Sequence, residues 1–312
     1  MQLSLLLMKE IAQLFAMLIM GYILVKAGLI KNNESKSISV ISVYLVMPCV
    51  IINAFQVEAT PEVQQGLIWA FIAAGAAHVI FLVANMIFRP IFKLDVIERA
   101  SLIYPNAAML VIPLVKNLLG QQYVIYSSAF VIIQTILLWT QCKNMLCGEE
   151  KIEWKKVLLN INIISIIIGL LLFILKIELP EPVVSVMSSM SDMVGPLGML
   201  LAGMVIAEAP LSAVFGKKRN YLTVVLRLFV YPVLALLVLK IILPFVTLED
   251  SKNILLTVYL ACITPACATI TTMAQLYDRD APHASAIYVL TTTLAIITMP
   301  IMTSLFLTVM GM

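Results

Sequence analysis

Charged side chains are scarce in this 312-residue chain. Asp, Glu, Lys and Arg make up 12% of it, whereas hydrophobic residues make up 62%. Soluble domains contain about 25% charged and roughly 45–50% apolar residues. No soluble core accommodates this excess of apolar side chains, so the composition excludes a soluble protein. The sequence instead predicts an all-α protein that crosses a membrane several times.

Motifs for catalysis and for cofactors are also missing. The chain has no glycine-rich phosphate loop, which argues against ATP-driven transport. It has no pair of intramembrane aspartates and no recognisable serine nucleophile with a histidine base, so we expect no enzyme. We expect no metal, no cofactor beyond coupling to H+ or Na+, and no nucleic-acid partner. The cysteines show neither metal-ligand nor disulfide spacing and are interpreted as packing residues: Cys49, Cys142, Cys147, Cys262 and Cys267.

Apolar runs of about 20 residues, the length that crosses the hydrocarbon core of a bilayer, recur along the chain. The apolar N-terminus is followed by no small-residue cleavage site, so we interpret it as the first span. The polar stretch 143–155 separates five spans from five, which divides the chain into residues 1–147 and 148–312. The ten predicted spans lie near 8–27, 36–56, 66–88, 97–119, 122–142, 156–176, 182–207, 218–246, 252–277 and 283–310.

Basic residues predict the orientation of these spans. Only Lys9, Lys116, Lys176 and Lys252 lie on one predicted side of the membrane. The opposite side holds Lys26, Lys31, Lys36, Arg89, Lys93, Arg99, Lys143, Lys151, Lys155, Lys156, Lys217, Lys218, Arg219 and Arg279. By the positive-inside rule both termini are outside and the stretch 143–155 is cytoplasmic. Each half has five spans, so the second half begins on the opposite side and the repeats are predicted to be inverted.

Two spans carry prolines in their middle. The stretch from Glu98 to Gly120 contains Pro105 and Pro113, and the stretch from Leu255 to Asp278 contains Pro265. Proline breaks or kinks a helix, and in hydrocarbon the freed carbonyls need protein or water as partners. Paired interrupted spans in corresponding places of two halves indicate the binding site of a secondary transporter.

A second pair of prolines supports an internal repeat. Pro48 in the second span corresponds in position to Pro196 in the seventh, as Pro105 corresponds to Pro265. A shared ancestor of the two halves is the simplest account. The alternative is that proline is simply frequent in transmembrane helices.

The segments YPNAAMLVIPL, GPLGMLLAGMVIA, RLFVYPVLALL and ITPACATITTMAQLYDRDAPHASAIYVLTTTLAIITMP resemble the auxin efflux carrier family, which includes bacterial malate and other organic-acid permeases. The resemblance covers essentially the whole chain. It implies ten helices in two inverted five-helix repeats, with broken helices four and nine crossing beside the substrate. It also implies a scaffold of spans one, two, six and seven, often a dimer, and a moving domain of spans three to five and eight to ten.

The crossing is the expected substrate-binding site. Half-helices are predicted to begin near Asn106 and Ala266, and helix N-termini attract anions such as carboxylates. Thr264, Thr271 and Thr272 offer further hydroxyl groups. The alternative is that these side chains merely cap broken backbone or bond within their own helix. The predicted substrate-binding residues are Pro105, Asn106, Ala107, Gln134, Arg227, Pro265, Ala266 and Thr269.

Ionisable residues at predicted membrane depth are further candidates. Such groups are costly in a bilayer and by default indicate function with a partner. Arg227 is expected to supply fixed positive charge, and His78 and Asp192 are coupling candidates. The alternatives are that Arg227 pairs with a helix C-terminus or with Asp192, and that His78 is a satisfied buried histidine.

Together these features predict a multi-pass secondary transporter of small organic anions, such as malate or auxin-like acids, in the cytoplasmic membrane. Its expected partners are the anion, the lipid bilayer and a second copy bound through the scaffold helices. One alternative is a sodium-coupled carrier of the bile-acid symporter type. Another is a ligand sensor that does not transport. The substrate, the coupling ion and the direction of transport are left open by the sequence.

Overall fold

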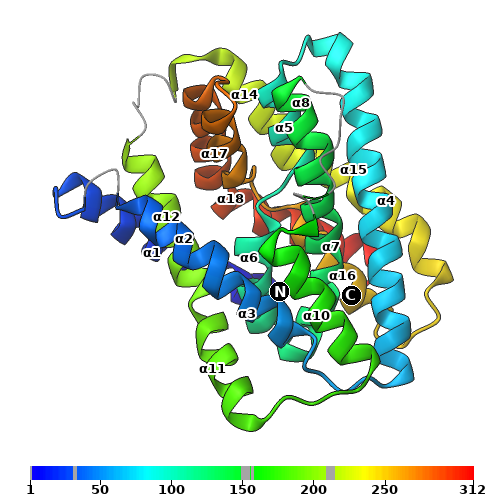
Figure 1. The fold of residues 1–312 in the computed structure, drawn as a ribbon. Helices are drawn as coiled ribbons and strands as arrows, with labels where there is room; N and C mark the ends of the chain where they lie inside the picture. The colour runs from blue at the N-terminus through cyan, green and yellow to red at the C-terminus, as the bar shows by residue number, and fades with distance from the viewer. Residues whose placement is uncertain (1, 31–33, 149–154, 156–157, 209–214) are drawn as a thin grey trace.

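The computed structural model of the protein describes residues 2–30, 34–148, 155, 158–208 and 215–312 (Figure 1). Within these ranges the regular structure is helical, and the only extended pairing there is one isolated bridge. The predicted all-α class is therefore confirmed. Residues 149–154 of the stretch 143–155 and the basic residues Lys31, Lys151 and Lys156, which count toward the predicted orientation, lie outside the described residues.

The first half of the chain forms eleven described helical elements. In order they are α1 (Gln2–Lys26), α2 (Ser35–Ile41), η1 (Ser42–Val46), α3 (Met47–Ala54), α4 (Pro61–Phe92), α5 (Val96–Ile103), α6 (Ala107–Leu118), η2 (Gln121–Tyr123), α7 (Val124–Leu137), η3 (Leu138–Cys142) and α8 (Lys143–Cys147).

The second half continues in the same way over its described ranges. Its elements are α10 (Ile161–Ile174), α11 (Glu181–Asp192), α12 (Val194–Glu208), α14 (Lys218–Val225), η4 (Leu226–Val230), α15 (Tyr231–Ile242), η5 (Leu243–Phe245), α16 (Ser251–Cys262), α17 (Ala268–Leu276) and α18 (Ala281–Met310).

Helices occupy all ten predicted ranges. Five continuous helical runs are long and apolar enough to cross a membrane: Pro61–Phe92, Gln121–Cys147, Glu181–Ala207, Lys218–Phe245 and Ala281–Met310. The chain is thus a multi-pass membrane protein by length and composition. Three predicted spans are too short. The first helix begins at Gln2 rather than near residue 8, the third span extends to both sides of 66–88, and the fifth continues beyond residue 142 through α8.

Local sequence explains where α4 begins and ends. Thr60 is its N-cap, with the hydroxyl accepting a hydrogen bond from the Val63 amide, and Pro61 follows at the first helical position. Both features favour a helix start. The helix passes through Pro90 and ends at Phe92, and its C-cap Lys93 adopts the left-handed conformation with φ of 51°.

Two π-helical turns lie directly before prolines. η1 ends two residues before Pro48, and η4 ends two residues before Pro232. Proline cannot donate to the carbonyl four residues earlier, so a wider turn is a local solution to the missing hydrogen bond. The turn η4 is important because it carries Arg227.

The helices form two groups, and α1 and α12 of one group contact α6 and α18 of the other. In the first group α1 packs along α12, and α3 packs against α10 and α11. The contact between α1 and α12 is backbone to backbone, because a β-carbon at Gly21 or Gly203 would overlap the facing backbone. In the second group α4 packs against α7, α15 and α16, around fully buried side chains such as Phe81 and Tyr231.

Candidate functional site

The two interrupted segments cross each other at the centre of the fold. The chain is extended between α5 and α6 and again between α16 and α17, and Pro105 pairs with Ala266 in an antiparallel bridge. The Asn106 amide donates to the Pro265 carbonyl at 2.7 Å, and the Cys267 amide donates to the Tyr104 carbonyl at 3.0 Å. Backbone groups of the two extended segments therefore bond to each other, and this pairing satisfies them away from water.

Four helix ends meet at this crossing. The helices α5 and α16 end there with their carbonyl groups, while α6 and α17 begin there with their amide groups. The amide end of a helix carries roughly half a positive charge and the carbonyl end roughly half a negative charge. An anion is therefore attracted to the starts of α6 and α17 and repelled by the ends of α5 and α16.

Arg227 binds the two carbonyl ends. Its guanidinium donates to the Leu102 carbonyl of α5 at 3.0 Å and to the Cys262 carbonyl of α16 at 2.6 Å. It also donates twice to the Thr264 carbonyl, at 3.2 and 2.9 Å. The side chain has no exposed surface, and it lies over the ring of Phe81 with 5.5 Å between the guanidinium carbon and the ring centroid. Of the two structural pairings weighed from the sequence, the structure has the one with helix C-termini.

Two amide side chains at the crossing have polar atoms without partners among the described residues. Asn106 is the N-cap of α6 and is 3% exposed, and its Nδ2 group makes no hydrogen bond there. Gln134 of α7 donates to the Pro105 carbonyl at 2.7 Å, but its Oε1 atom accepts nothing in the described part of the chain. Buried polar groups are normally paired, so these two atoms are candidates for contact with a ligand.

The remaining predicted substrate-binding residues lie at or near the crossing. Ala107 and Ala266 are buried, and the Ala266 amide donates to the Thr291 hydroxyl at 3.2 Å. Thr269 is half-buried in the first turn of α17. Thr264 bonds back to the Ala261 carbonyl at 2.9 Å, which is the local use of a threonine that the sequence left open. The side chain of Thr272 is outside the described part.

Sequence reasoning missed Thr291. It lies in α18, where three threonines follow one another at positions 291–293. Its hydroxyl also donates to the Ile287 carbonyl at 2.8 Å, so it joins α18 to the break before α17. The run of three threonines inside an apolar helix was the available signal.

His78 lies beside the crossing rather than in it. The Nδ1 atom is 2.8 Å from the Ala74 carbonyl of its own helix, and the ring packs on Phe130 with 4.3 Å between centroids. The Nε2 atom has no partner among the described residues. Phe81 separates His78 from Arg227 and contacts both. His78 and Arg227 therefore share the ring of Phe81 as a common neighbour.

Asp192 lies away from the crossing, at the end of α11. Its carboxylate pairs with Lys116 of α6, and the two side chains are 59% and 36% exposed. The pair lies in the wall of a cavity of about 210 Å³ between α1, α3, α6 and the junction of α11 with α12. The structure thus separates Asp192 from Arg227 and from the other predicted site residues.

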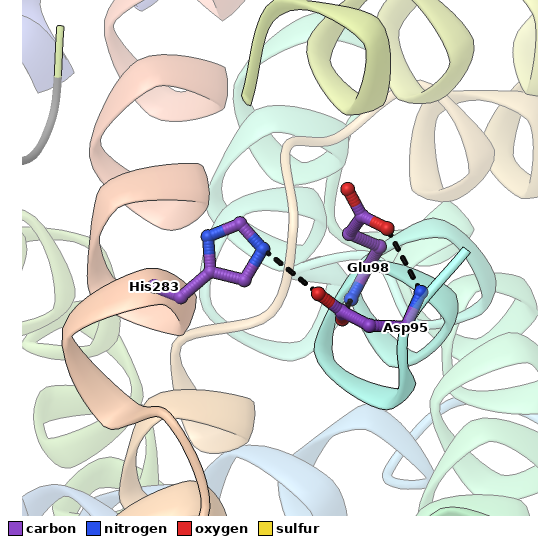
Figure 2. A group of neighbouring side chains, drawn as sticks. All are labelled: Asp95, Glu98 and His283. Atoms are coloured by element: carbon purple, nitrogen blue, oxygen red, sulfur yellow. Dashed lines mark hydrogen bonds and ion pairs between the residues drawn. The ribbon is translucent and has the colours of Figure 1, made fainter. Parts of the chain in front are cut away.

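A second polar cluster lies at the start of α5 (Figure 2). Glu98 and Asp95 form a capping box, and the His283 Nε2 atom is 3.3 Å from an Asp95 oxygen. The three side chains offer possible metal-ligand atoms within 4.8 Å of one another. However, both oxygens of the buried Glu98 accept hydrogen bonds from Arg219, at 2.5 and 2.8 Å. The guanidinium takes the place that a cation would occupy, so we assign this cluster a structural role.

The apolar helical runs and the crossed breaks define a polytopic α-helical membrane protein. The profile of a family described as membrane transport protein matches residues 6–153 and 149–303. These ranges cover almost the whole chain, so the protein belongs to this family, and the resemblance to auxin efflux carriers is confirmed. No curated protein matches the chain. The protein is therefore a membrane transporter by family.

Proposed function

We propose that the protein is a secondary transporter of small organic anions and that the anion binds at the crossing of the two broken helices. The observation that carries the proposal is the arrangement of helix ends around Arg227. The guanidinium occupies the carbonyl ends of α5 and α16. Their negative potential is thereby offset, and the amide ends of α6 and α17 are left to determine the sign of the site.

The unpartnered amide of Asn106 supports the same site. A carboxylate at the start of α6 accepts hydrogen bonds from free backbone amides and from the Asn106 Nδ2 group. Gln134 contributes differently, because its amide group already holds the Pro105 carbonyl. In this proposal Asn106 contacts the anion, Gln134 fixes the broken segment, and Arg227 acts through the helix ends.

Transport would proceed by alternating access, in which the site is exposed first to one side of the membrane and then to the other. The proposed architecture is two inverted five-helix repeats, residues 1–147 and 148–312. The packing supports a division into a scaffold and a moving unit. The elements of spans one, two, six and seven contact one another through α1 with α12 and α3 with α10 and α11. The elements of spans three to five and eight to ten contact one another through α4 with α7, α15 and α16. A dimer through the scaffold stays a prediction.

Uptake into proteoliposomes tests the function. Radiolabelled malate and other small carboxylates would be offered to the purified, reconstituted protein, with the sodium and proton gradients imposed separately. We expect carboxylate uptake that stops when the driving gradient is collapsed. Dependence on sodium alone would favour the bile-acid symporter type of coupling. Specific carboxylate binding without any uptake or exchange would favour a sensor and contradict the proposal.

Substituting Asn106 tests the site. Asn106→Ala removes one hydrogen bond to a charged ligand, which contributes roughly 1.5–3 kcal/mol, so affinity should fall about ten- to hundredfold. The measurement is equilibrium binding of the transported carboxylate to purified protein. Asn253→Ala is the matched control, because Asn253 lies at the other end of α16 and bonds to Tyr123 and Asp250. Unchanged affinity in Asn106→Ala would remove this residue from the site.

A further inference from the structure

The cavity beside Lys116 has the features of a separate binding site. Its volume is about 210 Å³, and it opens between α1 and α3 on one wall and α6 on the other. Lys116 and Asn106 are ten residues apart, which corresponds to about 15 Å along the helix axis. The cavity is therefore distinct from the crossing, although the same helix lines both.

Polar side chains from both walls line the cavity, and Lys116 is the cation among its lining residues. Lys116 contributes an ammonium group that is paired with Asp192, and Gln13 and Gln121 lie at exposed positions of the lining. Asn53 also lines the cavity and is 8% exposed. We find no hydrogen bond from the Asn53 side chain to any residue that the structure describes. A largely buried amide that faces a cavity and has no partner in the described part of the chain is expected to bond to water or to a ligand.

A second, smaller cavity leads from this site toward the crossing. It has a volume of about 30 Å³ and is lined by Leu110 and Leu114 of α6 and by Pro265. Leu14 of α1 lines both cavities. The face of α6 between Lys116 and the crossing is therefore bordered by space along the seam with α1.

We propose that the larger cavity is an access subsite for a small carboxylate, in which the carboxylate replaces Asp192 on Lys116 and accepts a hydrogen bond from Asn53. This inference rests on the proposed function, because it gives the transported anion a first stop before the crossing. Replacing the Asp192 carboxylate on Lys116 by the carboxylate of the ligand changes the Coulomb energy little. The subsite is therefore weak and releases its ligand readily, which suits a position on an access path.

Substituting the two members of the ion pair should change carboxylate affinity in opposite directions. Lys116→Gln removes the cation and should weaken carboxylate binding about tenfold, the lower end of the range for a charged hydrogen bond, because the lysine is partly exposed. Asp192→Asn removes the competing carboxylate and should tighten binding. A merely structural ion pair would give both variants the same sign of effect.

A cysteine at the rim of the cavity reports occupancy directly. In a Gln13→Cys background, alkylation of the new thiol would be followed by mass spectrometry against increasing malate. Malate should slow the reaction, and its uncharged dimethyl ester should not. Lys116→Gln should raise the half-protecting malate concentration about tenfold, and Asp192→Asn should lower it. Lys252→Gln is the matched control, since Lys252 bonds to the Gly311 carbonyl outside the cavity lining.

The outcomes separate this inference from the proposed function. Protection that shifts in opposite directions in the two variants supports the subsite. If malate is transported by proteoliposomes but never protects the engineered thiol, or protects it equally in all variants, the subsite is wrong and the function stands. If malate protects in the expected manner but no carboxylate is transported, the subsite stands and the proposed function is wrong. If malate neither protects the thiol nor is transported, both the subsite and the proposed function are wrong.

Discussion

At the scale of single residues, Arg227 combines a high cost with several compensating contacts. An arginine at the centre of a membrane helix costs about 2.5–3.5 kcal/mol on insertion scales. Here the guanidinium is fully buried, yet four of its N–H groups donate to carbonyls of the two broken segments. The ends of α5 and α16 would otherwise leave these carbonyls without donors. Arg227 therefore supplies hydrogen-bond donors to the broken helices, and their carbonyls supply the acceptors that its buried guanidinium needs.

Arg227→Gln should destabilise the protein by about 3 kcal/mol or more, since hydrogen bonds to charged groups contribute roughly 1.5–3 kcal/mol each and are not additive. Arg227→Lys should recover only part, because one ammonium group lacks the planar fork that reaches Leu102 and Cys262 together. Thermal unfolding in detergent measures both effects. Lys240→Gln, an exposed lysine farther along the same helical run, is the control.

Carboxylate binding by Arg227→Gln at a temperature where it remains folded gives a second readout. The charge that offsets the carbonyl ends would be gone, so binding should weaken even in folded protein. Normal stability and normal binding together would show that the crossing depends on neither the charge nor the hydrogen bonds of Arg227.

At the scale of elements, the start of α5 is fixed by its cap. Asp95 accepts from the Glu98 amide at 2.8 Å, and Glu98 accepts from the Asp95 amide at 2.9 Å. Burial raises the pKa of the Asp95 carboxyl, but hydrogen bonds from His283 and from the Glu98 and Ile97 amides lower the pKa by more in total. The net pKa is therefore below its ordinary value. The ionised carboxylate contributes stability at neutral pH.

Asp95→Ala should destabilise the protein by about 1 kcal/mol, while Asp95→Asn should cost less because asparagine is also a good N-cap. Thermal unfolding measures both variants. A lowered folded-state pKa gives stability that is present above the unfolded pKa, about 3.9, and lost as pH falls through the folded value. Both variants lack this carboxylate. They should therefore lose less stability than the parent as the pH falls from about 5 by roughly two pH units. Equal acid sensitivity in Asp95→Asn and the parent would contradict this assignment.

Proline made the two helix breaks predictable, but sequence did not show all of their partners. Pro105 and Pro265 indicate where a helix cannot continue, and the crossing predicted from family resemblance is visible as paired backbone. Arg227 on two carbonyl ends and Lys116 on Asp192 join residues that are far apart in the chain. Such pairs leave no local pattern of spacing. Thr60 before Pro61, by contrast, was a readable start signal for α4 that hydropathy alone overlooked.

At the scale of the whole molecule, hydrogen bonds and an ion pair join several of the loops predicted to be cytoplasmic. Arg219, in the first turn of α14, donates to the Lys93 carbonyl after α4 at 2.6 Å. Lys217 lies 3.7 Å from Asp280 after the ninth span, and Arg279 donates to the Leu146 carbonyl after the fifth. Figure 1 shows α5, α8, α14 and α17 at one end and α11 at the opposite end. The basic connections after the third, fifth, seventh and ninth spans thus lie together at one end of the molecule, and the side of the membrane that this end faces stays a prediction.

Cysteine accessibility tests which end faces the cytoplasm. Glu249→Cys, in the exposed turn before α16, should react with an impermeant thiol reagent added to intact cells, and Lys218→Cys, exposed at the start of α14, should react only after permeabilisation. The positive-inside rule gives this direction, because the end with Lys217, Lys218 and Arg219 carries most of the basic residues. The background would replace the half-buried Cys49 and Cys147 with serine and retain the three buried cysteines. That background without an engineered cysteine sets the baseline. Labelling of Lys218→Cys in intact cells, with Glu249→Cys protected, would invert the orientation and place both termini in the cytoplasm.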